Sequence, residues 1–292
     1  IARNNLPADY YKKYLTNLAA VDAAKVQNAA QLFLNTNQMH IVIVGNAKQI
    51  AKGLEKYGPI KYFDIEGNEV AAPTEVKADA SLTPTVLMEK AIAAIGTKEA
   101  LNSVKDVQLK GTANLMGQSL EMKQTIVMPG NSVTTMSMGG MAMMRQAVVD
   151  GKYSFAQQGQ EAPITDDIKE GLDESAFLAP EQLYLAKGYG LKIVGAEKVD
   201  GKDAIDVEVT TPSKKVSHRF YDATTFLLVK TSKSEEVPGQ GTMTQQQYYT
   251  GYKVVNGVQI ASEQLIDMGQ MKINIKYTDI KMNQGLKSSD LK

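Results

Sequence analysis

From Val104 onward, apolar and polar residues alternate with a period of two through most of the remaining chain, which is the pattern of β-strands with one buried face. Gly117-Gln118 is a two-residue turn signal within this pattern. A turn there sorts the flanking strands into two faces, and one of them is apolar: Val107, Leu109, Gly111, Ala113 and Leu115 against Leu120, Met122, Gln124, Ile126 and Met128. The other face carries Asp106, Glu121 and Lys123, which we expect to be solvated.

Other turn signals repeat this arrangement along the chain. Gly269-Gln270 places Ile266 opposite Ile273 and Asp267 opposite Lys272, and Asp200-Gly201 and Asn256-Gly257 are further hairpin signals. In this part of the chain, helical patterns occur at Pro84–Ile95, before the strands, and within 161–187. The predicted fold class is α+β: one antiparallel sheet of roughly ten to twelve strands, curved into an open half-barrel with covering helices.

A methionine-rich stretch, "MPGNSVTTMSMGGMAMMRQ", holds six of the fourteen methionines. A turn at Gly139-Gly140 would place Met138 opposite Met141 and Met136 opposite Met143, all on one side, with Thr134 and Arg145 beyond them. Three interpretations remain open: a Cu(I) site of soft thioethers, ordinary core, or an adaptable apolar surface at the mouth of a lipid-binding trough. The sequence favours the last, because Met is unbranched and polarizable and suits variable ligands, and neither Cys nor His assists the thioethers as a copper site would require.

The first seventy residues follow a different pattern. We expect a helix after Pro7, a second helix capped by Asp22, a buried strand at Met39–Gly45 ("MHIVIVG") and a short helix ended by Gly58. These elements are too few to enclose a core, so we interpret residues 1–70 as part of a larger domain whose remainder lies upstream. Residues 71–82, in an Ala/Glu/Pro-rich stretch without periodicity, are the expected linker, and residues 83–292 the second domain.

Composition excludes several classes of function. Lys+Arg and Asp+Glu are both 32 and no dense basic run exists, so nucleic acid is not an expected partner. The absence of Cys removes thiolate, iron–sulfur and disulfide chemistry. The chain has no apolar run of about 18 residues, so we expect a protein peripheral to a membrane rather than spanning it. We expect the carboxylate pairs Asp166-Asp167 and Asp173-Glu174 to form a solvated helix face, and His218 to lie on a sheet face.

The order of elements in "LPADYYKKYLTNLAAVDAAKVQNAAQLFLNTNQMHIVIVGNAKQI" and "YGPIKYFDIEGN" resembles the C-terminal end of insulinase/pitrilysin-type zinc metallopeptidase domains. That family binds zinc through an H-x-x-E-H motif. This chain has only His40 and His218, far apart, so no catalytic residue and no cofactor are assigned here. The resemblance implies that zinc, and a peptide substrate, would belong to an upstream domain.

The second part resembles the LolA-like fold of periplasmic lipoprotein carriers, an unclosed β-barrel. The resemblance rests on strand rhythm and turns in "VKDVQLKGTANLMGQSLEMKQTIVMPG", "LKIVGAEKVDGKDAIDVEV" and "YYTGYKVVNGVQIASEQLIDMGQMKINIKYTDI". It implies a concave apolar face that receives acyl chains, and a periplasmic or outer-membrane-associated location. The expected partner is therefore a lipid or an acylated lipoprotein.

The leading functional hypothesis is a non-catalytic lipid- or acyl-binding module. Its rivals are the substrate-binding part of a zinc endopeptidase whose active site lies upstream, and a docking domain whose apolar face is only core. The face assignment predicts the ligand-binding residues, which are Leu109, Ala113, Leu115, Leu120, Met122, Ile126, Met136, Met138, Met141, Met143 and Arg145.

Overall fold

The computed structural model describes residues 6–34, 39–45, 47–63, 67–70, 72, 81–115, 117–237, 241–269 and 271–291. The chain divides into two compact units, Ile1–Glu69 and Val70–Lys292. Each unit is described by itself below. The predicted linker falls largely on residues outside the described ranges.

Unit 1 contains short helices. They are α1 (Tyr10–Ala19), α2 (Ala23–Phe33), α3 (Ala47–Leu54) and a 3₁₀ turn, η3 (Glu55–Tyr57), and β1 (Tyr62–Phe63) pairs with β2 (Glu69–Val70). Asp22 caps α2 as predicted, because its carboxylate accepts a hydrogen bond of 2.8 Å from the Lys25 N–H. No residue of α1 or α2 is buried, and Leu15 and Phe33 are 74% and 79% exposed.

The strand predicted at Met39–Gly45 is wrong. These residues are assigned to no strand, and Val44 is 96% exposed. The four β-branched residues in a row, Ile41–Val44, favour a strand, but a strand exists only with a hydrogen-bonded neighbour, and the described part of the chain supplies none to this segment. Unit 1 therefore presents apolar side chains on its helices and on its extended segment alike.

Unit 2 is built on one antiparallel sheet with thirteen strands in the described residues. The first six are β3 (Asp106–Leu115), β4 (Gln118–Val127), β5 (Asn131–Met138), β6 (Met141–Val149), β7 (Lys152–Gln157) and β8 (Gln160–Glu161). The other seven are β9 (Gly190–Val199), β10 (Lys202–Thr210), β11 (Val216–Asp222), β12 (Leu228–Val237), β13 (Gly241–Val255), β14 (Val258–Asp267) and β15 (Lys272–Met282).

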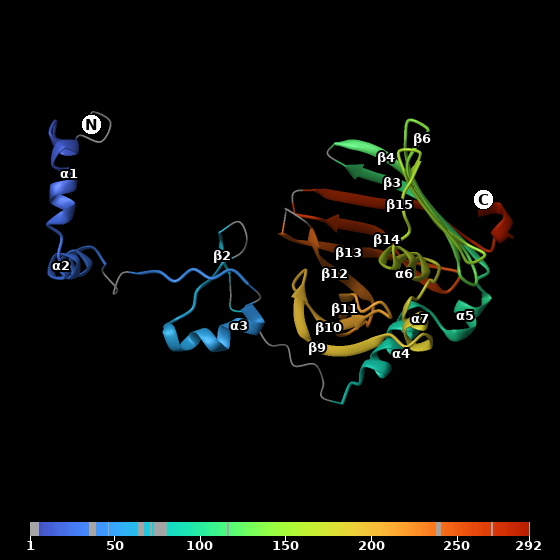
Figure 1. Ribbon diagram of the computed structural model, residues 1–292. Coiled ribbons are helices and arrows are strands. Elements are labelled where there is room, and N and C mark those ends of the chain that lie inside the picture. Colours follow the sequence, from blue (N-terminus) through green and yellow to red (C-terminus); the bar gives the residue numbers. More distant parts are fainter. Residues whose placement is uncertain are drawn as a thin grey trace. The chain divides into compact units, whose positions relative to one another are not determined.

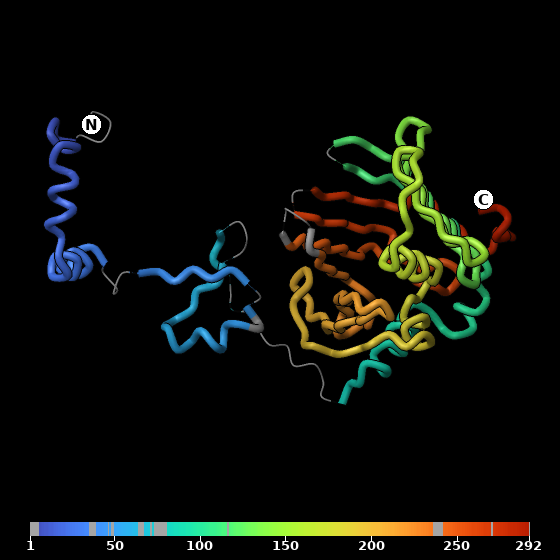
Figure 2. Tube along the Cα trace, in the orientation of Figure 1, coloured from blue at the N-terminus to red at the C-terminus, as the bar shows by residue number. Residues whose placement is uncertain are grey.

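Each of these two groups is a meander, and the meanders meet where β3 pairs with β15. In Figure 2 the green first strand lies beside the red last strand. At this seam Gly111 pairs with Tyr277, and a Cβ at Gly111 would lie 2.0 Å from the Lys276 carbonyl oxygen. The close approach of the two backbones therefore requires glycine at this position.

Two-residue turns set the strand pairing. At Gly269 the predicted pairs are confirmed, since Ile266 pairs with Ile273 and Asp267 with Lys272. At Gly117 the predicted pairing is wrong by two residues, because Leu115 pairs with Gln118 and the loop starts one residue earlier. A shift of two residues keeps every side chain on its face, so the predicted division into an apolar and a polar face survives the error.

Four helices accompany the sheet: α4 (Pro84–Ile95), α5 (Lys98–Ser103), α6 (Asp166–Ser175) and α7 (Glu181–Ala186). Thr83, Thr97 and Thr165 cap the first three, each accepting a hydrogen bond from an N–H three residues later. α4 contacts α7, β9 and β14, and α6 contacts β6, so the sheet curves around these helices (Figure 1). The predicted open half-barrel with covering helices is confirmed.

The polar face of β3 holds one exception to the prediction. Asp106 is fully buried, and its carboxylate accepts hydrogen bonds from the N–H groups of Gln284, Gly285 and Leu286. The segment after β15 is thereby fixed to the start of β3, and it leads into a final 3₁₀ turn, η4 (Ser288–Leu291). None of the described helices is long and apolar enough to cross a membrane.

Candidate functional site

The concave face of the sheet carries a contiguous group of apolar side chains, here called the apolar cluster. Its side chains come from α5 and from strands of both meanders on either side of the β3–β15 seam. Its buried members are Leu101, Val104, Val107, Leu109, Ala113, Leu120, Met122, Ile126, Val258, Ile275, Tyr277 and Met282. Five of the predicted ligand-binding residues, Leu109, Ala113, Leu120, Met122 and Ile126, are therefore brought together, and Leu115 packs against them. Their role in binding stays a prediction.

The methionine hairpin joins this cluster in a form that differs from the prediction. Gly139 and Gly140 both have positive φ, as a two-residue turn requires, and Met138 pairs with Met141 as expected. The register then shifts, so that Met136 pairs with Met144 and the predicted pairing with Met143 is wrong by one residue. Met143 is the extra residue of a β-bulge, which hydrophobic patterning does not reveal.

Three of the four predicted methionines nevertheless share a site. Met136, Met138 and Met143 pack against the apolar cluster, whereas Met141 is 69% exposed and lies outside it. Arg145 pairs with Thr135, one step from Met136, and thus lies on the opposite face of the sheet. There its guanidinium donates hydrogen bonds to Ser154 Oγ (3.2 Å) and to the Leu291 carbonyl oxygen (2.9 Å). Arg145 thereby holds η4 against the sheet, and its predicted position beside the methionines is wrong.

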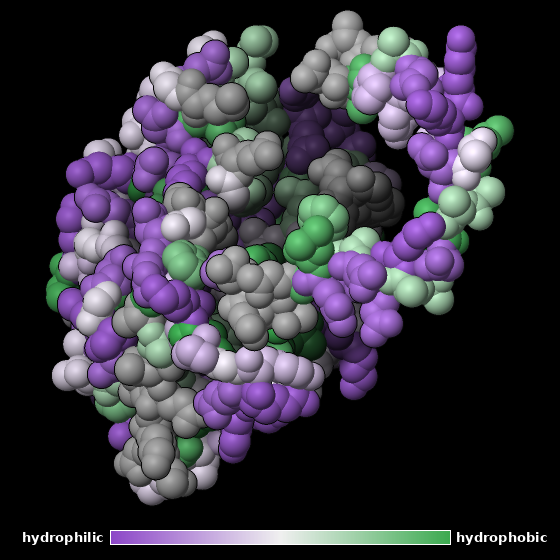
Figure 3. Space-filling view, turned by 90° about the vertical axis from the view of Figure 1, so that its left-hand side faces the viewer, coloured by the Kyte–Doolittle hydropathy of each residue, from purple (hydrophilic) through white to green (hydrophobic). Residues whose placement is uncertain are grey.

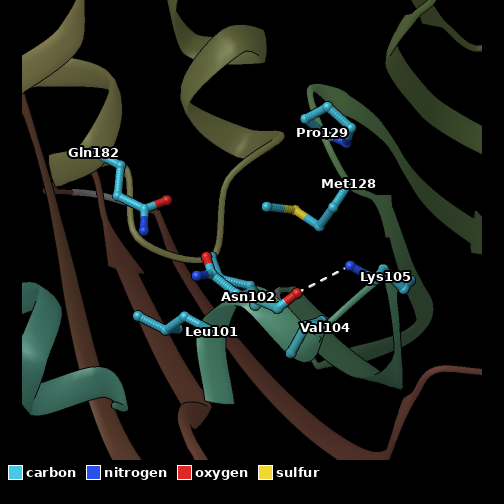
Figure 4. Close-up of a pocket in the computed structure, with 8 residues that line it drawn as sticks. Leu101, Asn102, Val104, Lys105, Met128, Pro129 and Gln182 are labelled. Atoms are coloured by element: carbon cyan, nitrogen blue, oxygen red, sulfur yellow. Dashed lines mark hydrogen bonds between the residues drawn. The ribbon is translucent and has the colours of Figure 1, made fainter. Parts of the chain in front are cut away.

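A pocket opens from the surface onto the apolar cluster (Figure 4). Its volume is about 180 Å³, and this surface pocket is lined by Leu101, Asn102, Val104, Lys105, Met128, Pro129, Leu178 and Gln182. Leu101 and Val104 are members of the apolar cluster, and Met128 and Leu178 pack against it. The pocket is therefore an entrance to the buried apolar face, between α5, the β4–β5 turn and the α6–α7 connection.

Sequence analysis missed this entrance, although two signals mark it. Pro129 follows the end of β4, and Leu178-Ala179-Pro180 separates the two helices of the insertion. Both are chain reversals, and neither indicates which other segment lies across from it. Hydrophilic residues cover most of the face shown in Figure 3, and hydrophobic residues appear there in separate patches, as expected when the main apolar surface is buried.

The other half of the concave face buries charge. A polar network joins α6 and α7 to β11: Arg219 pairs with Glu174, and the Tyr221 hydroxyl donates to Glu181 Oε1 at 2.8 Å. The Arg219 guanidinium also lies 4.9 Å from the centre of the Tyr184 ring. Glu181 is 1% exposed and Arg219 7%. The expectation that Asp173-Glu174 is a solvated pair is wrong, since Glu174 pairs with Arg219 and Asp173 accepts a hydrogen bond from the Tyr153 hydroxyl.

Burial and charge shift the ionisation of this network. Burial opposes the charge of Arg219, but Glu174 and the surrounding tyrosines hold its pKa well above the ordinary value. Burial, together with the hydrogen bond to Asp173, raises the pKa of Tyr153 to about 12. Glu181 Oε2, the Tyr184 hydroxyl and Arg219 Nε are buried without a hydrogen-bond partner among the described residues. The network therefore holds a cationic Arg219 and leaves some polar atoms unpaired.

Outside the polar network, one histidine of the described residues contacts a carboxylate. No group of three His, Asp or Glu side chains suited to a metal ion occurs in them. His218 lies on the outer face of the sheet, as predicted, and contacts Asp206 Oδ1 at 2.8 Å through Nδ1. That hydrogen bond, against the opposing effect of burial, raises the pKa of His218. This hydrogen bond links β10 and β11 on that face.

No protein-family model and no curated protein matches the chain. Solved structures do match it. The crystal structure of a DUF1329 family protein from Desulfovibrio piger is 11% identical, covers 72% of this chain and 98% of its own, and has a TM-score of 0.51. At this identity the likeness shows a shared fold.

Two further structures have lower TM-scores. A putative outer membrane lipoprotein-sorting protein domain from Vibrio parahaemolyticus is 12% identical, with coverages of 70% and 95% and a TM-score of 0.49. A LolA superfamily protein from Nitrosomonas europaea is 12% identical, with coverages of 73% and 98% and a TM-score of 0.46. The insulinase-type resemblance of residues 1–70 stays a prediction.

Proposed function

We propose that the sheet unit is a non-catalytic module of the cell envelope, periplasmic or outer-membrane-associated, that binds a lipid or the acylated end of a lipoprotein. The observation that carries this proposal is the surface pocket, which opens directly onto a contiguous buried apolar cluster. Burial of acyl methylenes would drive binding, at about 0.8 kcal/mol for each. The candidate ligand contacts are the predicted residues that belong to or pack against the apolar cluster.

The methionines support an adaptable site rather than a fixed one. Met136, Met138, Met143 and Met128 all pack against the cluster, and unbranched thioether side chains rearrange at low cost. The Cu(I) alternative loses support, since Met141, one of its four predicted ligands, is 69% exposed and is not packed against the apolar cluster with the other three. An acyl chain entering at the surface pocket would displace flexible side chains rather than polar groups.

Probe binding tests the proposal. A fluorescent fatty-acid analogue should bind the purified chain and be displaced by unlabelled lipid, and organic extraction of protein from a Gram-negative host should release lipid. Met143→Gln should weaken probe binding severalfold, because it places an amide in the cluster. Met141→Gln, on the same hairpin but exposed, is the matched control and should bind like the unmodified protein. Absence of both probe binding and extractable lipid would rule the module out.

For unit 1 we propose attachment to a peptidase-type domain, of which residues 1–70 form the C-terminal part. The supporting observation is that apolar side chains on α1, α2 and Met39–Val44 are exposed, including Leu15, Phe33 and Val44. Such surfaces are typical of segments that pack against another part of a domain. A longer polypeptide with an H-x-x-E-H motif should contain zinc and cleave peptides, whereas this chain alone should do neither.

A further inference from the structure

The rim of the surface pocket carries one charged group. Lys105 is the only ionisable side chain among the eight lining residues, which otherwise contribute apolar groups and the amides of Asn102 and Gln182. On the basis of the proposed function, we propose that this pocket selects a single-chain amphiphile with an anionic end. The anion would bind at Lys105, and the chain would pass over Leu101, Val104 and Met128 toward the apolar cluster.

Lys105 is held at the rim by its backbone. Its N–H donates to Asn283 Oδ1 at 2.7 Å, and its carbonyl oxygen accepts from the Met128 N–H at 2.8 Å. The C-terminal segment and the β4–β5 turn thus fix the start of the side chain from two sides. Figure 4 shows the side chain folded toward Asn102, whose carbonyl oxygen accepts a hydrogen bond of 3.0 Å from Nζ. The ammonium retains two further N–H donors for a ligand.

The nearest carboxylate in sequence does not compete for this ammonium. Asp106 is fully buried, and its two oxygens accept hydrogen bonds from three backbone N–H groups after β15. The described residues contain no carboxylate within ion-pair distance of Lys105. The rim is therefore positive, and an anion would meet no matching negative charge in the lining.

The pocket size favours one chain over two. A cavity of about 150 Å³ lined by apolar groups binds benzene, so about 180 Å³ accommodates roughly six carbon atoms. Affinity should rise about fourfold with each methylene over this range. Longer chains gain affinity only if Met128 and Leu178 yield and the chain reaches the apolar cluster. A second chain beside the first has no space at this entrance.

Four ten-carbon ligands test the proposal on the full chain by calorimetry, below their micelle-forming concentrations: decanoate, decyl phosphate, decanol and decylamine. Both anions should bind about fivefold more tightly than decanol, the gain of one exposed ion pair, and decylamine should bind most weakly. A preference for decanoate would identify a fatty acid, and one for decyl phosphate a lysophospholipid-type head group.

Matched lysine variants locate the effect. Lys105→Gln should lower anion affinity to that of decanol and leave decanol binding unchanged. Lys110→Gln removes an exposed lysine from the outer face of β3, the strand that follows Lys105, and should change neither. Equal binding of all four ligands, or equal losses in both variants, would overturn this proposal and leave apolar binding intact. Failure of all four to bind would overturn the proposed function with it.

Discussion

The two halves of the concave face are buried to a similar extent but are filled differently. Around the β3–β15 seam the side chains are apolar and include three methionines of one hairpin. Under α6 and α7 the same face buries Arg219 and Glu181, with the half-buried Glu174 and tyrosines around them. In the first half, apolar side chains can rearrange around an acyl chain without leaving a buried polar group unpaired. The second half cannot, since each displaced partner would leave a buried charge.

This difference assigns separate tasks to the two halves. Helices α6 and α7 are held by directional pairs to β7 and β11, through Tyr153–Asp173, Arg219–Glu174 and Tyr221–Glu181. The surface pocket lies where the connection between these helices meets the apolar cluster. The polar network therefore fixes the frame, and the apolar half provides the adaptable surface.

The largest effect should come from breaking the polar network. Arg219→Met removes the buried cation that pairs with Glu174, and should lower the free energy of unfolding by about 3–5 kcal/mol. Urea unfolding measures this. Lys198→Met is the control, because Lys198 pairs with Asp203 at 2.8 Å with both side chains about half exposed, and it should cost at most about 1 kcal/mol. Similar decreases in the free energy of unfolding of the two variants would show that the polar network does not depend on its buried charge.

Leucine truncations sharpen the comparison. Leu120→Ala, in the apolar cluster, and Leu183→Ala, on α7 beside Glu181, remove equally buried side chains and should each cost about 2–4 kcal/mol. A short acyl ligand should restore part of the thermal stability of Leu120→Ala, since it can fill an apolar cavity. It should not restore Leu183→Ala. Equal rescue of both variants would show that ligand reaches the polar half as well.

The smallest effect concerns the outer face of the polar half. The raised pKa of His218 means that the protonated imidazole favours the folded state. Its contribution is present below the ordinary pKa of about 6.5 and is lost as the pH rises through the raised pKa. His218→Asn should therefore cost less than about 1 kcal/mol near pH 5 and nothing near pH 9. In an Asp206→Asn background this pH dependence should disappear, and its persistence would place the effect elsewhere.

The faces of the strands could be predicted because side chains alternate strictly and two-residue turns fix which face each strand presents. An error of two residues at Gly117 left Leu109, Ala113 and Leu120 on the correct face. The bulge at Met143 could not be predicted, since an inserted residue leaves composition and turn signals unchanged. It moved Arg145 to the opposite face from the one expected.

Features that depend on distant partners were beyond the sequence. Glu174 and Arg219 are 45 positions apart, and a carboxylate on a short helix gives no sign of the arginine that covers it. Arg219 did carry a signal of burial. It alternates with Ser217 and Tyr221 in β11, so its side chain lies on the same face of the sheet as the buried Tyr221. The surface pocket joins three segments far apart in the chain, and Met39–Gly45 has strand composition without a partner strand in the described residues.

The pairing of β3 with β15 also delays completion of the sheet during synthesis of the chain. The N–H groups that bind the Asp106 carboxylate lie 178–180 positions further along the chain. During translation, the β3–β8 meander has an unpaired edge and exposed apolar side chains until β15 has been synthesised. At about 5–20 residues per second that interval lasts on the order of ten seconds or longer. Until then, the unpaired edge of β3 and these apolar side chains are open to contacts with other chains.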